Sequence, residues 1–463
     1  MELRTAARLI ALGCAALTGS AAAQINLPSL RLPSLPSSAL PGPFGQAVGD
    51  SAQLGPAALM SARRASAHAL IRQNRQLIEA DPNGEPMLRG QLVAFELGAQ
   101  ALDHVIAAGF EPLGGQPPDR TDLAIQLLRA PPGMSTARAL RRLRELEPTV
   151  VFDYDHLYGG SASGVEPVNA MPATADGAAL AAPDADTLSP GGVRVGLIDG
   201  GVQVTHSVFH EASITLSGCD GRPVPSSHGT AIASLLVGAA APFRGAAPGA
   251  RLYAADVYCG QPTGGAVDAI AAAFGWLDAQ RVAVINISLV GPDNQVLRQV
   301  VRQMIERGHI VVAAVGNDGP AAAPLYPAAY PGVVGVTAVD AQRRVLLEAA
   351  RGSQVEFAAP GADAAAARCP QGYASVRGTS FAAPLVAGLL APRLPAPDPQ
   401  QARAAIDSLA REAIHLGADG RNPSYGFGLV AEALRTAPDI MQAGPKNASL
   451  AMEENRTADR CAL

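Results

Sequence analysis

The second half of the chain alternates short apolar runs with longer segments of helical periodicity. The apolar runs predict strands at residues 193–199, 251–258, 282–289, 309–316 and 333–339, and the periodic segments predict helices at 228–238, 266–279, 293–307 and 380–391. Strands that are apolar on both faces are typical of a parallel sheet covered by helices on both sides. The pattern predicts an α/β fold with a doubly wound parallel sheet, whose functional residues should lie at the carboxyl ends of the strands.

A smaller pattern of strands and helices precedes this one. It predicts one helix over residues 57–80, strands at 92–97, 123–128 and 149–152, a helix with Leu102, Val105, Ile106 and Phe110 on its apolar face, and another with Leu140, Leu143 and Leu146. The order resembles βαββαβ with one strand poorly defined, which indicates a small α+β domain of the ferredoxin-like type.

The N-terminus has the pattern of an export signal over residues 1–23. Two arginines precede the apolar run 9–17, and small residues at 21–23 offer a cleavage site. We expect a secreted or periplasmic protein. The segment that ends at Cys14 partly resembles a bacterial lipoprotein signal, so a lipid anchor at Cys14 stays open as an alternative.

Composition narrows the class of partner. The chain has 463 residues, 48% of them hydrophobic, and a net charge of −5. A chain of this length can bury a large core and is expected to hold more than one domain. The negative balance, without a long basic tract, argues against a nucleic-acid partner.

Four polar residues follow or open the predicted elements of the second half. Asp199 ends a strand, His228 begins a helix, Asn317 follows another strand, and Ser380 lies in Gly378–Pro384 at the start of a helix. Unpaired backbone N–H groups at a helix start suit a developing oxyanion. A serine becomes a nucleophile only with a base in reach and an acid that orients the base, and the chain offers one of each.

These motifs resemble those of the subtilisin-like serine proteases (subtilases). The matching segments are Ile198–Val202, His228–Thr230, Val315–Asn317 and Gly378–Pro384, in the family's order. The resemblance implies a subtilisin-like catalytic domain over residues 191–436 that hydrolyses proteins or peptides through an acyl-enzyme. Asp199, His228 and Ser380 would be its triad, and Asn317 would donate to the oxyanion.

The resemblance also implies a substrate cleft lined by Ser288, Leu289, Val290, Gly316 and Leu325. Val290 stands where the family usually has glycine, and Leu325 should narrow the base of the primary pocket. The loop that holds calcium in many relatives offers no carboxylate here, so we expect no metal and no other cofactor.

In such proteases a prodomain inhibits the enzyme by laying its tail in the cleft. Residues 57–158 would be this intramolecular inhibitor, between linkers at 24–56 and 159–190, with residues 437–463 as a tail; an unrelated accessory domain is the alternative. We expect a monomer that cuts itself near Tyr158, with Tyr158 at the primary pocket. A cut somewhere in residues 163–187 is the rival.

Without Cys14, four of the five cysteines remain, and an even number in an exported chain favours disulfides. Four cysteines allow three pairings. Cys219 ends an expected strand at 213–216, and Cys259 ends the strand at 251–258. In similar folds these strands are neighbours, which favours Cys219–Cys259, with Cys369–Cys461 as the second pair.

Two other classes of protein stay in view. A catalytically silent binding or surface protein could keep the fold, although the four polar residues are intact. An esterase of the α/β-hydrolase type would need a G-x-S-x-G elbow and the chain order Ser, Asp, His, whereas here the serine comes last.

Overall fold

The computed structural model describes residues 56–113, 123, 125–160, 164–167, 192–442 and 461. All of them belong to one unit of mutually contacting segments, Pro41–Leu463. The expected export signal, Cys14 and nearly all of the linker 24–56 lie outside the described residues, and they remain predictions.

A parallel seven-stranded sheet forms the centre of the main domain (residues 192–442). Its strands lie in the order β17-β16-β15-β13-β8-β12-β9, and every neighbouring pair is parallel. The strands are β8 (Arg194–Asp199), β9 (Ser213–Ser217), β12 (Arg251–Asp256), β13 (Val284–Ile287), β15 (Ile310–Ala314), β16 (Val334–Val339) and β17 (Val355–Pro360). The prediction of a doubly wound parallel sheet is confirmed.

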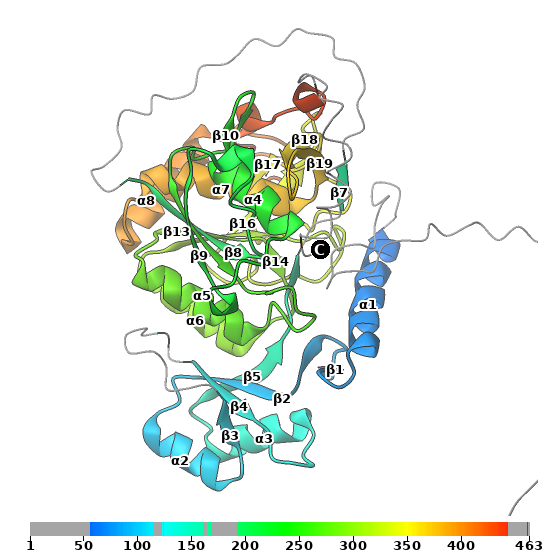
Figure 1. The fold of residues 1–463 in the computed structure, drawn as a ribbon, viewed down its shortest axis with the longest axis vertical. Helices are drawn as coiled ribbons and strands as arrows, with labels where there is room; N and C mark the ends of the chain where they lie inside the picture. The colour runs from blue at the N-terminus through cyan, green and yellow to red at the C-terminus, as the bar shows by residue number, and fades with distance from the viewer. Residues whose placement is uncertain are drawn as a thin grey trace, which may run out of the picture. The chain divides into compact units, whose positions relative to one another are not determined.

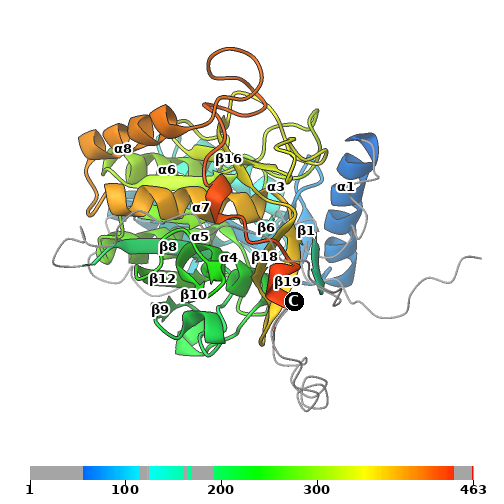
Figure 2. The ribbon, with the colours of Figure 1, turned by 90° about the horizontal axis from the view of Figure 1, so that it is seen from above.

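Helices cover both faces of this sheet (Figure 1). They are α4 (Ser227–Val237) and α7 (Thr379–Leu390) on one face, and α5 (Val267–Ala279) and α6 (Gln295–Glu306) on the other. A further helix, α8 (Pro399–Glu412), packs beside α7 (Figure 2). Along β8, Val195 and Leu197 pack on the α4 and α7 side while Ile198 packs on the α5 side, which explains the continuous apolar run.

Several elements of the main domain escaped prediction, among them one strand of the central sheet and one helix. Strand β17 and helix α8 lie where no strand or helix was expected. The signal for α8 was present: Asp398 accepts hydrogen bonds from the backbone N–H groups of Gln400 and Gln401, and Pro399 is the first helical residue.

The upstream domain (residues 56–158) is an antiparallel sheet with two helices on one face. Its elements are α1 (Pro56–Gln73), β1 (Ile78–Ala80), β2 (Pro86–Phe95), α2 (Ala99–Ala107), β3 (Glu111–Leu113), β4 (Ile125–Arg129), α3 (Thr136–Leu146) and β5 (Val151–His156). Strand β2 lies between β4 and β5, β3 lies beyond β4, and β1 also pairs with β2. This is the ferredoxin-like order that the sequence indicated.

The two faces of β2 belong to different cores. Leu92 and Ala94 pack with α2 and α3, whereas Val93 and Phe95 join the cluster that contains α5 and α6 of the main domain. The face of the upstream sheet that carries no helix of its own is therefore covered by the main domain. Because side chains alternate along a strand, Leu92 and Ala94 lie on one face of β2 and Val93 and Phe95 on the other.

Two expectations upstream are wrong. The helix predicted over 57–80 ends at Gln73, because the chain turns at Asn74, whose carbonyl accepts the N–H groups of Leu77 and Ile78, and Ile78 then pairs with Leu88 in the sheet.

The expected linker 159–190 also begins with ordered strands. Strand β6 (Gly159–Gly160) pairs with β14 (Leu289–Val290), and β7 (Gly164–Pro167) pairs with β19 (Tyr373–Arg377). The rest of that linker lies outside the described residues.

Smaller elements and two disulfides complete the main domain. The remaining strands are β10 (Ala239–Ala240), β11 (Phe243–Arg244) and β18 (Ala364–Ala367), and short 3₁₀ turns lie at Ser207–Phe209, Cys219–Gly221, Ala391–Arg393, Glu432–Leu434 and Ile440–Gln442. Both favoured cysteine pairs are bonded, with Cα–Cα distances of 5.2 Å for Cys219–Cys259 and 6.2 Å for Cys369–Cys461.

Candidate active site

Asp199 ends β8, an inner strand of the sheet, at the point where the sheet changes winding direction. Strands β12 and β13 flank β8, so the carboxylate lies where open α/β sheets place their ligands. Its Oδ1 accepts the Gly200 N–H at 2.7 Å and hydrogen-bonds with His228 Nδ1 at 2.7 Å. An ionised carboxylate can only accept, so Nδ1 carries the proton of the neutral imidazole.

Helix α4 presents His228 in its first turn. Ser226 caps this helix, because its hydroxyl accepts the Gly229 N–H at 2.9 Å. A Cβ at Gly200 would lie 2.4 Å from the Ser226 hydroxyl, so the glycine after Asp199 makes room for this cap. Sequence reasoning missed Ser226, although a serine two residues before a helical histidine is a readable cap.

Helix α7 begins at Thr379 and brings Ser380 beside the end of strand β13. The preceding Gly378 has φ 138°, a conformation that favours glycine. The Ser380 hydroxyl is buried and donates to the Ser288 carbonyl at 3.4 Å, while the Ser288 hydroxyl donates to the Ser380 carbonyl at 3.0 Å. The rings of Phe381 and His228 lie 5.8 Å apart, so the start of α7 lies beside the histidine.

His228 and Asn317 both contact the start of α7, and each has one buried polar atom without a partner. Within the described part of the chain, the Nε2 atom of His228 and the Nδ2 amide of Asn317 have no hydrogen-bond partner. The other end of the Asn317 amide is fixed, because its Oδ1 accepts the Thr379 N–H at 3.1 Å. An unsatisfied buried polar atom costs about 1–3 kcal/mol, so two such atoms on residues beside one helix start indicate a functional site.

The candidate pocket residues Gly316 and Leu325 lie against each other. Gly316 has φ +98°, and a Cβ there would lie 2.5 Å from the Leu325 Cδ1 atom. The Gly316 N–H donates to the Thr379 hydroxyl at 3.2 Å, and this hydrogen bond connects Gly316 to the helix that carries Ser380. Leu325 therefore lies over Gly316, and the narrowing of a primary pocket by Leu325 stays a prediction.

Strand β14, which holds the candidate substrate-binding residues Leu289 and Val290, is already paired with another part of the same chain. In β6, Gly159 pairs with Val290 and Gly160 with Leu289. A Cβ at Gly160 would lie 3.7 Å from His228 Nε2, so Gly160 is the residue that faces the imidazole. The expectation that Tyr158 occupies the primary pocket is wrong, because the register of β6 and β14 places Gly160 beside His228, and Tyr158 comes two residues before Gly160.

A second, half-buried carboxylate, Asp256, was missed. Asp256 lies opposite Asp199 in the register of the parallel strands β12 and β8. Its position at the end of an expected strand could therefore have marked it as a candidate site residue. Its Oδ1 accepts the N–H groups of Tyr258 and Cys259, both at 2.9 Å. Burial, and after it the charge of Asp199, raises the pKa of Asp256.

One group within the described residues has the spacing of a metal site, Cys219 with Asp256 and Cys259. Its two sulfur atoms are bonded to each other, so they are not the thiolates that a metal of this ligand type requires.

Comparison with known proteins identifies the family. Residues 191–428 match the model of the Subtilase family. The chain belongs to the subtilase family.

Two relatives give the extent of the likeness. Subtilisin DY of Bacillus licheniformis is 32% identical over 250 residues, which cover 51% of this chain and 88% of that protein. Minor extracellular protease Epr of Bacillus subtilis (strain 168) is 30% identical over 248 residues, which cover 51% of this chain but 37% of Epr. Residues 191–428 are thus a subtilase serine endopeptidase domain, and the chain spans little more than a third of Epr's length.

Among solved structures, fervidolysin from Fervidobacterium pennivorans, a keratinolytic enzyme related to subtilisin, shares the fold. The TM-score is 0.61, with 18% identity, over 80% of this chain and 62% of that chain. The subtilase match itself covers 238 of 463 residues, about 51%, so the likeness in fold extends beyond the subtilase domain.

Proposed function

We propose that this subtilase is the self-processing precursor of a secreted endopeptidase, with Ser380 as nucleophile, His228 as base and Asp199 as orienting acid. The observation that carries the proposal is the 2.7 Å bond from His228 Nδ1 to Asp199, which leaves Nε2 as the basic nitrogen beside the Ser380 helix. The name of Epr, an extracellular protease, supports export, as do two disulfides. No helix in the described ranges has the length and apolar character needed to cross a membrane.

The proposed reaction follows from the positions of these atoms. The Ser380 hydroxyl turns from the Ser288 carbonyl toward His228 Nε2, loses its proton there and attacks the substrate carbonyl. The Asn317 Nδ2 amide and the Ser380 backbone N–H then donate to the oxyanion. His228 protonates the leaving amine, and water releases the acyl-enzyme by the reverse steps. Peptide substrates would bind along Ser288, Leu289 and Val290.

We assign residues 57–158 the role of intramolecular inhibitor. Strand β5 supports this role because its carboxylates meet the first turns of two helices of the subtilase domain. Asp153 Oδ2 accepts the Gln295 N–H at 2.7 Å, and Asp155 Oδ1 accepts the Asp268 N–H at 3.2 Å. The negative charge of Asp153 is favourable at the N-terminus of α6, while the buried Asp155 contributes its hydrogen bond to α5.

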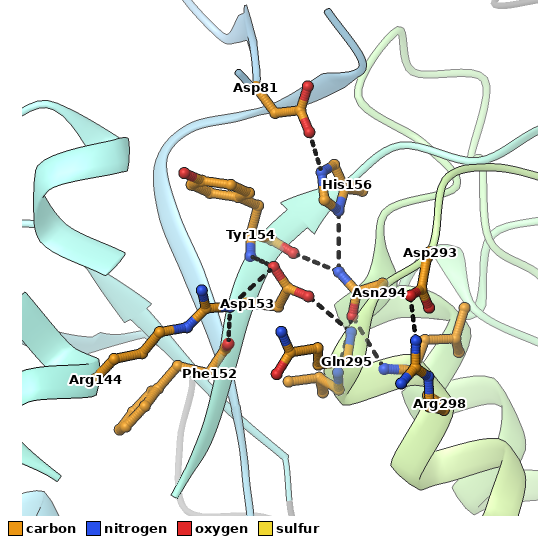
Figure 3. Close-up of polar contacts among 12 residues, drawn as sticks. Asp81, Arg144, Phe152, Asp153, Tyr154, His156, Asp293, Asn294, Gln295 and Arg298 are labelled. Atoms are coloured by element: carbon orange, nitrogen blue, oxygen red, sulfur yellow. Dashed lines mark hydrogen bonds and ion pairs between the residues drawn. The ribbon is translucent and has the colours of Figure 1, made fainter. Parts of the chain in front are cut away.

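Asn294 joins the two domains at the same place (Figure 3). Its Nδ2 donates to the Tyr154 carbonyl at 2.8 Å and to His156 Nδ1 at 3.0 Å. Because Nδ1 accepts, Nε2 of His156 carries the proton and faces Asp81 at 3.4 Å. A buried polar network of this kind fixes the docking geometry.

Helix α1 adds a second attachment near the oxyanion residue. Arg63 bonds to Asp318, the neighbour of Asn317, at 3.0 Å, and to Glu85 at 3.0 Å. The upstream domain therefore contacts the subtilase domain at the first turns of α5 and α6 and also beside Asn317, which supports the inhibitor role.

The register of β6 supports a cut between Ser161 and Ala162, both outside the described residues. Gly160, the last described residue before this bond, pairs with Leu289, and the carbonyl of the neighbouring Ser288 lies 3.4 Å from the Ser380 hydroxyl. A serine also suits a pocket narrowed by Leu325. A cut further along, in residues 163–187, is the rival.

The decisive experiment compares the precursor with Ser380→Ala and with Ser353→Ala, an exposed serine of the same domain. In a host without other proteases, we expect the precursor and the Ser353 variant to mature to an N-terminus at Ala162 and to react with a fluorophosphonate. The Ser380 variant should do neither. A silent binding protein would stay unprocessed and unlabelled in all three forms.

A further inference from the structure

The loop that carries Asn317 lies between regular elements and needs contacts from elsewhere to hold its position. Gly316 and Gly319 flank Asn317 and Asp318, and both have positive φ, 98° and 101°, a region that glycine enters without steric cost. In the precursor, Arg63 of helix α1 bonds to Asp318 at 3.0 Å. That contact comes from the upstream domain. In the mature enzyme the position of Asn317 therefore depends on contacts within the subtilase domain.

The segment from Glu348 to Ala350 holds this loop on both sides of Asn317. The Gly319 N–H donates to the Glu348 carbonyl at 2.8 Å, and the Ala350 N–H donates to the Gly316 carbonyl at 3.0 Å. One hydrogen bond comes before Asn317 in the sequence and the other comes after it. A displacement of Glu348 would therefore displace the Asn317 amide.

The Glu348 side chain is buried and meets Arg377 at two points. Its side chain has 0% exposure. Arg377 Nε lies 2.7 Å from Oε1 of the carboxylate, and Arg377 Nη2 donates to Oε2 at 2.9 Å. A guanidinium that meets a carboxylate at two points fixes its direction as well as its distance. Because a buried charge is costly without a partner, the pair should stay closed.

Arg377 is held in place independently of Glu348. It is the last residue of β19, which pairs with β18, and the N–H of the following Gly378 donates to the Gly361 carbonyl at 2.8 Å. Ser380 follows three positions after Arg377. The ion pair therefore connects the strand that leads to Ser380 with the loop that carries Asn317.

We propose that Glu348 and Arg377 are positioning residues, whose ion pair holds the Asn317 amide at the place where it and the Ser380 N–H can donate to the same oxyanion. They act through Asn317 and not on the substrate. The inference rests on the proposed protease function and adds two residues to it. Neither residue lies in the four motifs on which the resemblance to subtilases depends.

The expected effect on kcat follows from this role. Glu348→Gln keeps the shape of the side chain, but it removes the charge and can turn an amide N–H toward the guanidinium, so the pair should loosen. A displacement of about 1 Å at a catalytic group can cost about 100-fold, so we expect kcat to fall by about 10- to 100-fold. KM should stay nearly unchanged, because the Asn317 donor acts on charge that develops only in the transition state.

Asn317→Ala separates this role from a general loss of structure. In that background the donor is already absent, so adding Glu348→Gln should lower kcat by less than about twofold more, since residues that act through one group are not additive. The control is Glu356→Gln. Glu356 lies on β17 of the same domain and forms an ion pair with Arg421 at 2.6 Å, and its loss should leave kcat unchanged.

A second pair of variants tests the same contact from Arg377, and it decides the inference even if Glu348→Gln does not fold. The Arg377 side chain is 31% exposed, so replacement there should be tolerated better. Lysine keeps the charge opposite Glu348 without the two-point contact, and glutamine keeps neither. We expect kcat to fall from wild type to Arg377→Lys and further to Arg377→Gln. Equal kcat values for all three enzymes would overturn the inference.

The assay is steady-state cleavage of a fluorogenic peptide by the mature enzymes, with active sites counted by fluorophosphonate titration. A kcat for Glu348→Gln within about threefold of wild type, or a change confined to KM, would overturn the inference and leave the proposed function standing. The same holds if Glu348→Gln lowers kcat equally in the Asn317→Ala background, or if Glu356→Gln lowers kcat as much. A wild-type enzyme that neither reacts with the fluorophosphonate nor cleaves the peptide would overturn the proposed function and this inference together.

Discussion

Replacing Asn317 by alanine separates the chemical role of this residue from its structural role. The substitution removes a buried Nδ2 donor that has no partner in the described part of the chain, and an Oδ1 acceptor that bonds to the Thr379 N–H at 3.1 Å. The donor acts on charge that develops only in the transition state. Its loss should lower kcat by about 10²–10³ and leave KM nearly unchanged.

The lost acceptor has a separate and smaller consequence. The Thr379 N–H lies in the first turn of α7, where a backbone donor has no partner within the helix. Thr379 is fully buried, so an unpaired N–H there should destabilise the fold by about 1–3 kcal/mol. For a domain of this size, that corresponds to a fall in melting temperature of roughly 2–12 °C.

The assay is steady-state cleavage of a fluorogenic peptide at enzyme concentrations fixed by fluorophosphonate titration. Asn317→Asp serves as the matched variant, because it keeps an oxygen for the Thr379 N–H but replaces the donor by a charge that repels the oxyanion. We expect it to lower kcat at least as far as alanine does. A kcat within about threefold of wild type for Asn317→Ala, or a change confined to KM, would refute the assignment of Asn317.

Three further predictions concern stability, and the first two are best measured in the Ser380→Ala background, where self-digestion is excluded. Replacing Cys219 and Cys259 by alanine opens a bond with a sequence separation of 40 and should lower the unfolding free energy by about 4 kcal/mol; a loss below about 1 kcal/mol in denaturant titration would contradict the chain-entropy estimate. Burial, and after it the charge of Asp268, raises the pKa of Asp155, so its protonated form favours the docked domain. The unfolding free energy of the precursor should therefore fall as pH rises through this raised pKa, by at most about 1.4 kcal/mol per pH unit. Asp155→Asn should make this pH dependence weaker. If the unfolding free energy of the variant and of the unsubstituted precursor changed with pH in the same way, Asp155 would not be the titrating group. Chelation with EDTA should change the stability of the active enzyme by less than about 1 kcal/mol, and a melting temperature many degrees lower would reveal a metal site that the sequence did not indicate.

The local sequence pattern was enough to predict the strands and helices around the central sheet of the main domain, because these strands are buried on both faces and read as continuous apolar runs. Expected strand and helix limits there lie within a few residues of the observed ones, as for α5, expected at 266–279 and observed at Val267–Ala279. Periodicity failed where a local pattern continued past a turn. The helix that begins at Pro56 ends at Gln73 because Ile78 pairs with Leu88 in the sheet, and this pairing depends on residues further along the chain.

The sequence by itself determined the α/β class, the ferredoxin-like order upstream, and the order of Asp199, His228, Asn317 and Ser380, because each depends on residues adjacent in the chain. Tertiary structure alone decided that Gly160, not Tyr158, faces His228. That outcome depends on the register between β6 and β14, two segments separated by about 130 residues. Register between distant strands is set by packing on both sides of the pair, here by Tyr158 over Gly291, and no local pattern in either strand contains that information.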